Sequence, residues 1–183
     1  MALAFIGLGS NLGNGRANLR RAWVQLGTHI GVQLLALSSP YLTKPVIKPE
    51  WLAGGHKLGE QPFTNAVGVL ESRLAALELL QVLQQVEKFF GRDRMRSADR
   101  IIDLDLLYYD DLVLGGQELI LPHPEMAKRL FVLAPLNELA PDRIHPRLGL
   151  TTRQMMQRLP IVEEMEVRRL DWGEYLEGSG EHL

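Results

Sequence analysis

An apolar run interrupted by two aspartates, residues 101–109 (IIDLDLLYY), constrains the fold more than any other segment of the chain. Successive side chains of a β-strand point to opposite faces, so Asp103 and Asp105 share one face while Ile102, Leu104 and Leu106 share the other. Two like charges on one face repel each other and resist burial unless cations neutralise them. The run therefore predicts a strand with one buried face and, on its other face, two carboxylates placed to bind one metal centre.

Four arginines lie just upstream of this strand, at Arg92, Arg94, Arg96 and Arg100. Carboxylates suit Mg²⁺ and guanidinium groups suit phosphate oxygens, so the segment indicates phosphoryl chemistry on a nucleoside triphosphate. A structural interpretation competes with this one, because the arginines could pair with acids on a solvated surface. The apolar residues around the aspartates weigh against it, since an unneutralised charge in a buried strand is costly.

The composition of the 183-residue chain narrows the class of protein. A net charge of −2 argues against a dedicated nucleic-acid binder, which would carry a basic excess. The absence of cysteine excludes disulfides, thiolate catalysis and Cys-ligated zinc. No apolar stretch is long enough to span a membrane and the N-terminus lacks a cationic signal-peptide start, so we expect a cytoplasmic protein that binds no membrane. Separately, we expect it to be a monomer. We expect one domain over residues 1–160 and a C-terminal extension with a frayed tail over residues 161–183.

Hydrophobic periodicity predicts alternating strands and helices along the chain. The expected strands cover residues 2–9, 32–41, 63–71 and 101–109, and the expected helices cover residues 18–26, 76–90, 129–139 and 151–159. This order predicts an α+β protein with a ferredoxin-like split βαβ sheet, helices packed against the sheet and C-terminal additions. The first and fourth strands can then lie side by side, with the two aspartates beneath the long loops at 46–62 and 92–100.

Short motifs follow one another in a recognisable order. They are residues 9–13 (GSNLG), 41–45 (YLTKP), 63–67 (FTNAV), 84–87 (QQVE), 91–94 (GRDR), 100–107 (RIIDLDLL), 121–124 (LPHP), 129–133 (RLFVL) and 135–141 (PLNELAP). In this ordered set the chain resembles the 6-hydroxymethyl-7,8-dihydropterin pyrophosphokinases of folate biosynthesis. The resemblance implies transfer of the pyrophosphoryl group of ATP to the hydroxymethyl oxygen of 6-hydroxymethyl-7,8-dihydropterin, with release of AMP.

The resemblance also implies roles for charged residues. Asp103 and Asp105 would bind two Mg²⁺ ions, and Arg92 and Arg100 would complete the catalytic set by holding phosphate oxygens. Further contacts to ATP are implied for Gln84, Glu87, Arg94, His123 and Arg129. Considered alone, a histidine between two prolines is more often a packed or capping residue, and this alternative stays open for His123.

For the pterin, the resemblance implies contacts from Thr43, Pro45, Val46, Phe63, Asn65 and Phe131. Phe63 and Phe131 would provide aromatic faces for the flat ring, and the Asn65 amide would recognise donors and acceptors along its edge. Ordinary core packing is the alternative for both phenylalanines.

The chain departs from the family pattern in its loops. Family members commonly carry a Trp-Gly-Pro-Arg run before the Asp-x-Asp strand, whereas this chain has Ser97-Ala98-Asp99-Arg100. The loop at 46–62 looks longer than usual and contains Trp51, which we predict to cover the pterin in place of the missing aromatic residue. Two other functions remain as alternatives: a non-catalytic ferredoxin-like binding module, and a metal-dependent phosphohydrolase that uses the same aspartates.

Overall fold

An antiparallel β-sheet forms the centre of the molecule. The computed structural model describes residues 1–44, 61–91, 101–160 and 167–173. The sheet consists of β1 (Ala2–Ser10), β2 (Val32–Leu37), β3 (Tyr41–Thr43), β4 (Phe63–Ser72), β5 (Asp103–Tyr109) and β8 (Val167–Arg169). Its strand order is β5-β1-β4-β3-β8, and β2 pairs with β4 as well. The first and the last of the four predicted strands, β1 and β5, are therefore neighbours, as expected.

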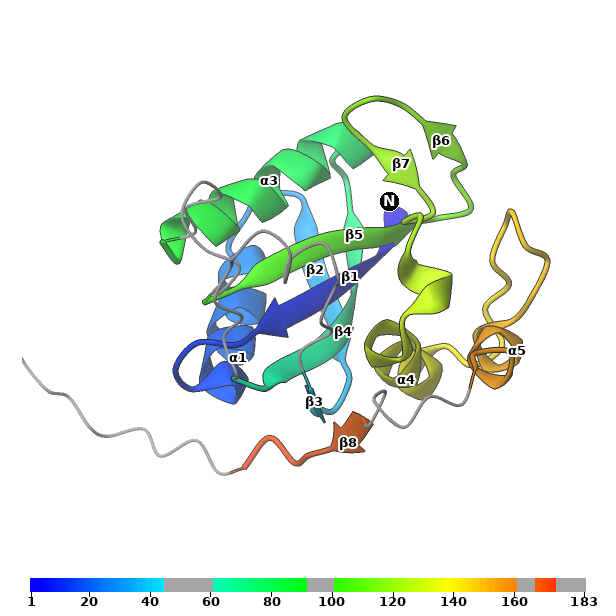
Figure 1. Cartoon of the computed structure of the whole chain (residues 1–183). Helices are drawn as coiled ribbons and strands as arrows, with labels where there is room; N and C mark the ends of the chain where they lie inside the picture. Colours follow the sequence, from blue (N-terminus) through cyan, green and yellow to red (C-terminus); the bar gives the residue numbers. More distant parts are fainter. Residues whose placement is uncertain (45–60, 92–100, 161–166, 174–183) are drawn as a thin grey trace, which may run out of the picture.

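Helices cover both faces of the sheet (Figure 1). Helices α1 (Gly15–Leu26) and α3 (Ala76–Phe89) pack on one face through the larger hydrophobic core. Helices α4 (Leu130–Leu139) and α5 (Thr152–Gln157), with the short 3₁₀ helix η1 (Met126–Lys128), form a second core on the other face. A small hairpin of β6 (Leu114–Gly115) and β7 (Ile120–Leu121) follows β5. None of the helices in the described ranges is long and apolar enough to cross a membrane.

Local sequence accounts for the limits and the buried face of α1. The Asn14 side chain accepts a hydrogen bond from Ala17 N at 3.1 Å and caps the helix, which ends at Gly27. Trp23 lies on the buried stripe and packs directly over Gly68 of β4. A Cβ atom at Gly68 would lie only 2.3 Å from the Trp23 ring, so this close approach requires glycine.

The predicted strand over residues 32–41 is wrong in one respect, because it is two strands, β2 and β3. Ser38 N donates to Val67 O at 2.9 Å, but Val67 N donates to Ser38 Oγ at 3.0 Å, so a side chain interrupts the backbone pairing with β4 between the two strands. Pro40 follows and has no N–H to continue a strand ladder. The hairpin and β8 were not predicted. Residues 167–169, which we placed in a C-terminal extension, pair with β3.

Candidate functional site

Asp103 and Asp105 lie on the same face of β5, as their spacing predicted. On β1 their partners in the antiparallel register are Gly9 and Gly7, whereas Leu104 between them belongs to the core on the opposite face. Both aspartates are half-buried. The apolar residues of the run thus anchor the strand, and the two carboxylates face the same side of the sheet.

Two glycines separate these carboxylates from the polar residues of β4. Gly9 pairs with Asp103 on one side and with Asn65 on the other, so the three residues form a row across three strands. A Cβ atom at Gly9 would lie 3.2 Å from Asn65 Oδ1 and 3.9 Å from Asp103 Cβ. Neighbouring strands are about 4.8 Å apart, so Asp103 and Asn65 rise about 10 Å apart from either side of a strand that contributes no side chain there. We call Gly7 and Gly9 the glycine floor.

The side chain of Asn65 is fixed by β3. Its Nδ2 donates to Thr43 Oγ1 at 2.9 Å, and both residues are buried. With Nδ2 held in this way, Oδ1 is the amide atom near Gly9. Phe63 is the register partner of Thr43 and is half-buried at the start of β4. The structure therefore brings together three of the residues predicted to contact the pterin.

Phe131 reaches this face from α4. It is partly buried against the second core, and the Arg129 guanidinium lies 5.8 Å from its ring centroid. Core packing therefore explains part of its burial, as the alternative interpretation held. Its helix packs against β4 on the face that carries Asp103 and Asn65.

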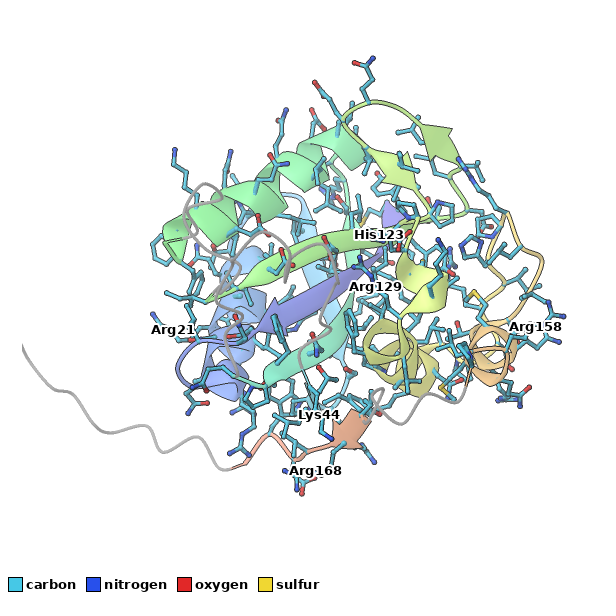
Figure 2. All side chains as sticks on the ribbon, in the orientation of Figure 1. Arg21, Lys44, His123, Arg129, Arg158 and Arg168 are labelled. Atoms are coloured by element: carbon cyan, nitrogen blue, oxygen red, sulfur yellow. The ribbon has the colours of Figure 1, made fainter. Side chains whose placement is uncertain are left out.

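His123 lies beside β5, close to the acidic pair. Its backbone N–H donates to Leu107 O at 3.0 Å, and its Nδ1 accepts from Glu125 N at 3.2 Å. Burial lowers the pKa of His123 below its ordinary value; the charge of Asp105 opposes this shift and Arg129 adds to it. The imidazole is therefore neutral near pH 7, and because Nδ1 accepts, Nε2 carries the proton. Figure 2 shows His123 and Arg129 next to each other near β5.

The two predicted residues of α3 differ in their surroundings. Glu87 is 2% exposed, and its Oε1 accepts from Leu104 N at 2.9 Å. It therefore binds the backbone of β5 at the residue between the two aspartates. Gln84, one turn earlier, is exposed. The predicted contacts of both residues with ATP stay predictions.

Several predicted site residues lie outside the described ranges. They are Pro45, Val46, Arg92, Arg94 and Arg100, together with Arg96, Ser97 and Trp51. The sequence reasoning in turn missed the glycine floor. The glycine floor could have been predicted from residues 5–10 (FIGLGS), because glycines two residues apart fall on one face of a strand.

The donor set fits Mg²⁺ better than zinc. In the described part of the chain, no three histidine, aspartate or glutamate side chains gather into a group that could enclose a metal ion. Zinc sites use three or four protein ligands, whereas Mg²⁺ is commonly held by one or two carboxylates together with water and substrate phosphates. Two half-buried carboxylates on one strand face, beside the glycine floor, match the second pattern.

Comparisons with known proteins agree on one family. Residues 5–141 match the family model described as 7,8-dihydro-6-hydroxymethylpterin-pyrophosphokinase (HPPK). A 2-amino-4-hydroxy-6-hydroxymethyldihydropteridine pyrophosphokinase of Synechocystis is 36% identical over 157 residues, which cover 85% of this chain and 75% of the relative. The protein of the same name from Bacillus subtilis is 38% identical over 138 residues, covering 75% of this chain and 77% of the relative.

Longer proteins contain the same domain as one part. The folic acid synthesis protein FOL1 of Dictyostelium discoideum is 32% identical across 86% of this chain, which spans 22% of that protein. A crystal structure of an HPPK-DHPS in complex with substrates superposes with a TM-score of 0.66 at 13% identity. That match covers 85% of this chain and 43% of the other, so the present chain spans less than half of it. At this identity the likeness concerns the fold: a mixed α/β arrangement with an antiparallel sheet.

Proposed function

The chain belongs to the 7,8-dihydro-6-hydroxymethylpterin-pyrophosphokinase family, and on that basis we propose which role each site residue has in the reaction. The enzyme transfers the pyrophosphoryl group of ATP to the hydroxymethyl oxygen of the dihydropterin in folate biosynthesis. The observation that carries the proposal is the row of Asp103, Gly9 and Asn65 across β5, β1 and β4. It separates an acidic half of the site from a half that recognises the pterin.

In the acidic half, Asp103 and Asp105 are the ligands of two Mg²⁺ ions. Bound there, the ions would supply charge neutralisation for the triphosphate and Lewis-acid activation of the attacking hydroxyl. Arg92 and Arg100 hold phosphate oxygens and stabilise the charge of the transition state, with Arg94 and Arg129 as further contacts to ATP. His123 supports this assignment by its neutral imidazole, whose Nε2–H is a donor for a phosphate oxygen. From α3, Glu87 supports the acidic half by holding Leu104 N between the two aspartates, and the exposed Gln84 is the further contact to the nucleotide.

In the pterin half, the Asn65 amide recognises the edge of the heterocycle, and Thr43 holds that amide in place. Phe63 and Phe131 flank the ring, and Pro45 and Val46 complete the pocket. The glycine floor lets the ring lie close to β1, because a side chain there would enter the space between Asp103 and Asn65. The pterin hydroxymethyl group then points toward the acidic half.

The chemistry is an in-line displacement at the β-phosphorus of ATP. A bond forms between this phosphorus and the pterin hydroxymethyl oxygen, which releases its proton to solvent. The bond from the β-phosphorus to the oxygen bridging it to the α-phosphorus breaks, and AMP leaves. The residues on the sheet contribute mainly by positioning, because the transferring group is already activated in the triphosphate.

We assign the sheet to the ferredoxin-like split βαβ class, with the enzyme acting as a monomer. The order β5-β1-β4-β2 supports this class, as does the packing of α1 and α3 on one face. The helices α4 and α5 and the strand β8 are then additions to that arrangement.

Formation of AMP tests the proposed roles. Asp103→Ala and Asp105→Ala are each expected to abolish pterin-dependent AMP release while the thermal melting temperature stays near that of the wild type. Asp142→Ala is the matched control, because this aspartate is exposed on a distant loop and pairs with Arg153. Retention of more than about a tenth of wild-type turnover, a cost below ~1.4 kcal/mol, would contradict the two-metal assignment. Release of phosphate or pyrophosphate from ATP without pterin would instead favour a phosphohydrolase.

A further inference from the structure

The segment 167–173 lies along the edge of the sheet next to the pterin half of the site. We call it the strap; it follows the family-matched residues 5–141 in the sequence. Its strand β8 pairs with β3, where Val167 is the register partner of Thr43 and Arg169 that of Tyr41. Beyond the strand, Leu170 N donates to Pro40 O at 2.8 Å. In Figure 1 the strap runs beneath β3, from the side of α4 toward α1.

On the face of the sheet that carries the site, the strap and α4 together hold the segment before β3. Glu138 of α4 accepts from Ser39 N and Ser39 Oγ, each at 3.0 Å, and from Tyr41 OH at 2.9 Å. Arg169 Nε donates to Ser39 Oγ at 2.9 Å, and its NH2 group lies 3.5 Å from Glu138 Oε1. The Arg169 side chain is 64% exposed, so this ion pair by itself contributes little stability.

On the opposite face, Trp172 is the main contact. Its Nε1–H donates to Ser38 O at 3.1 Å, and the Arg20 guanidinium of α1 lies 5.3 Å from its ring centroid. Arg16 of α1 donates to Asp171 O at 3.0 Å. Ser38 itself is fully buried and binds Val67 of β4 through its backbone and its hydroxyl. The strap therefore ties β3 and the residues before it to both helical layers.

This attachment bears on the site because β3 has only three residues and would be the edge strand without β8. A strand this short has little stability of its own. Its last residue, Thr43, is the one that fixes the Asn65 amide. We propose that the strap positions the pterin-recognising residues by holding β3 in register, with Trp172 as its principal positioning residue. This inference rests on the proposed pterin site.

The same geometry predicts that loss of Trp172 weakens the binding of the pterin but not the binding of ATP. β4 and β1 lie between β3 and β5, so the strap is at the opposite edge of the sheet from Asp103 and Asp105. Trp172→Ala is expected to raise KM for the pterin about three- to tenfold, the factor that corresponds to one net hydrogen bond. KM for ATP and kcat should remain within about twofold of the wild type, because the acidic half loses no contact. Hydrogen exchange at the amides of residues 41–43 should become faster while β5 is unchanged.

Two further variants complete the experiment. Trp172→Phe removes the indole N–H but keeps an aromatic ring, so it is expected to fold and to show a smaller rise in pterin KM. Arg168→Ala is the matched control, since Arg168 is an exposed residue of the same strand and its register partner is Leu42, which is not a predicted site residue. Equal changes in both KM values, or unchanged pterin KM in both Trp172 variants, would overturn the strap inference. Unchanged pterin KM in Asn65→Ala would instead overturn the proposed pterin site, so the two failures are distinguishable.

Discussion

The hydrogen bond between Thr43 and Asn65 is the smallest feature on which the proposed pterin recognition depends. Thr43→Val keeps the branched shape of the side chain but removes the acceptor of the Asn65 Nδ2–H. The amide can then rotate, and its buried donor loses a partner, which costs about 1–3 kcal/mol. Pterin affinity, measured by calorimetry with Mg²⁺ and a non-hydrolysable ATP analogue, should fall by about tenfold or more. Thr43→Ser retains the acceptor and should stay close to the wild type. Equal losses in both variants would show that packing, not the hydroxyl, is what matters.

His145, far from the site, gives a prediction about pH. Its Nδ1 accepts from Arg147 N at 3.2 Å and from Leu148 N at 3.3 Å, and its ring packs edge-on against Tyr108. Burial lowers the pKa of His145, with a further contribution from Arg147, while a hydrogen bond of its own backbone opposes the shift. The unfolded chain therefore binds this proton more readily than the folded one. The contribution of neutral His145 to stability is complete above about pH 6.5 and is lost as the pH falls below it.

The check is a series of thermal melts of the wild type and His145→Gln between pH 5 and pH 7.5. The variant is expected to be less stable at pH 7.5, because it lacks the ring packing and the aromatic acceptor. It should also lose less stability than the wild type on acidification. An equally steep decline in both proteins would show that other groups control acid stability.

At the scale of elements, substitution of Glu87 separates two roles of this residue: support of the β5 backbone and direct contact with the nucleotide. Glu87→Ala leaves the buried Leu104 N–H without its partner, so the free energy of unfolding in urea should fall by about 1–3 kcal/mol. Mg²⁺-dependent nucleotide affinity should fall with it, since Leu104 lies between Asp103 and Asp105. Glu87→Gln keeps an acceptor oxygen and should retain most of the stability. A variant with normal stability but weakened ATP binding would favour the direct nucleotide contact that the family resemblance implies.

Most elements could be predicted from the sequence because their signals are local. The buried stripe of α3 and the alternation in β5 each follow from side-chain spacing within one segment. Pro40 was a local signal for the break between β2 and β3, but the position of the break depends on Ser38 binding β4 across the sheet. β8 could not be predicted for a similar reason: three residues, two of them arginines, become a strand only because β3 offers an edge. In the site, the Asp-x-Asp spacing predicted the shared face, whereas the contact between Thr43 and Asn65 depends on tertiary register.

At the scale of the whole molecule, the two halves of the site should be energetically coupled. In the proposed site both substrates lie on one sheet face, and the reacting hydroxyl must approach a phosphate held through the aspartates. We therefore expect pterin to bind about tenfold more tightly, a coupling of ~1.4 kcal/mol, when Mg²⁺ and a non-hydrolysable ATP analogue are present. This favours binding of the nucleotide before the pterin. A non-catalytic module or a phosphohydrolase would show no such coupling.

The position of each substituted residue relative to the sheet predicts how the substitution changes this coupling between the two substrates. Asp103→Ala should abolish the coupling, because the variant cannot hold the nucleotide through metal beside the pterin. Trp172→Ala should weaken pterin binding by the same factor with and without the nucleotide analogue, because the strap acts only on the pterin half. Calorimetric titrations of pterin into both variants and the wild type, each with and without the Mg²⁺–nucleotide analogue, give the four affinities needed for each comparison. If the wild type bound pterin equally well in both conditions, the two halves would be independent, and the shared floor of Gly7 and Gly9 would not link the two substrates.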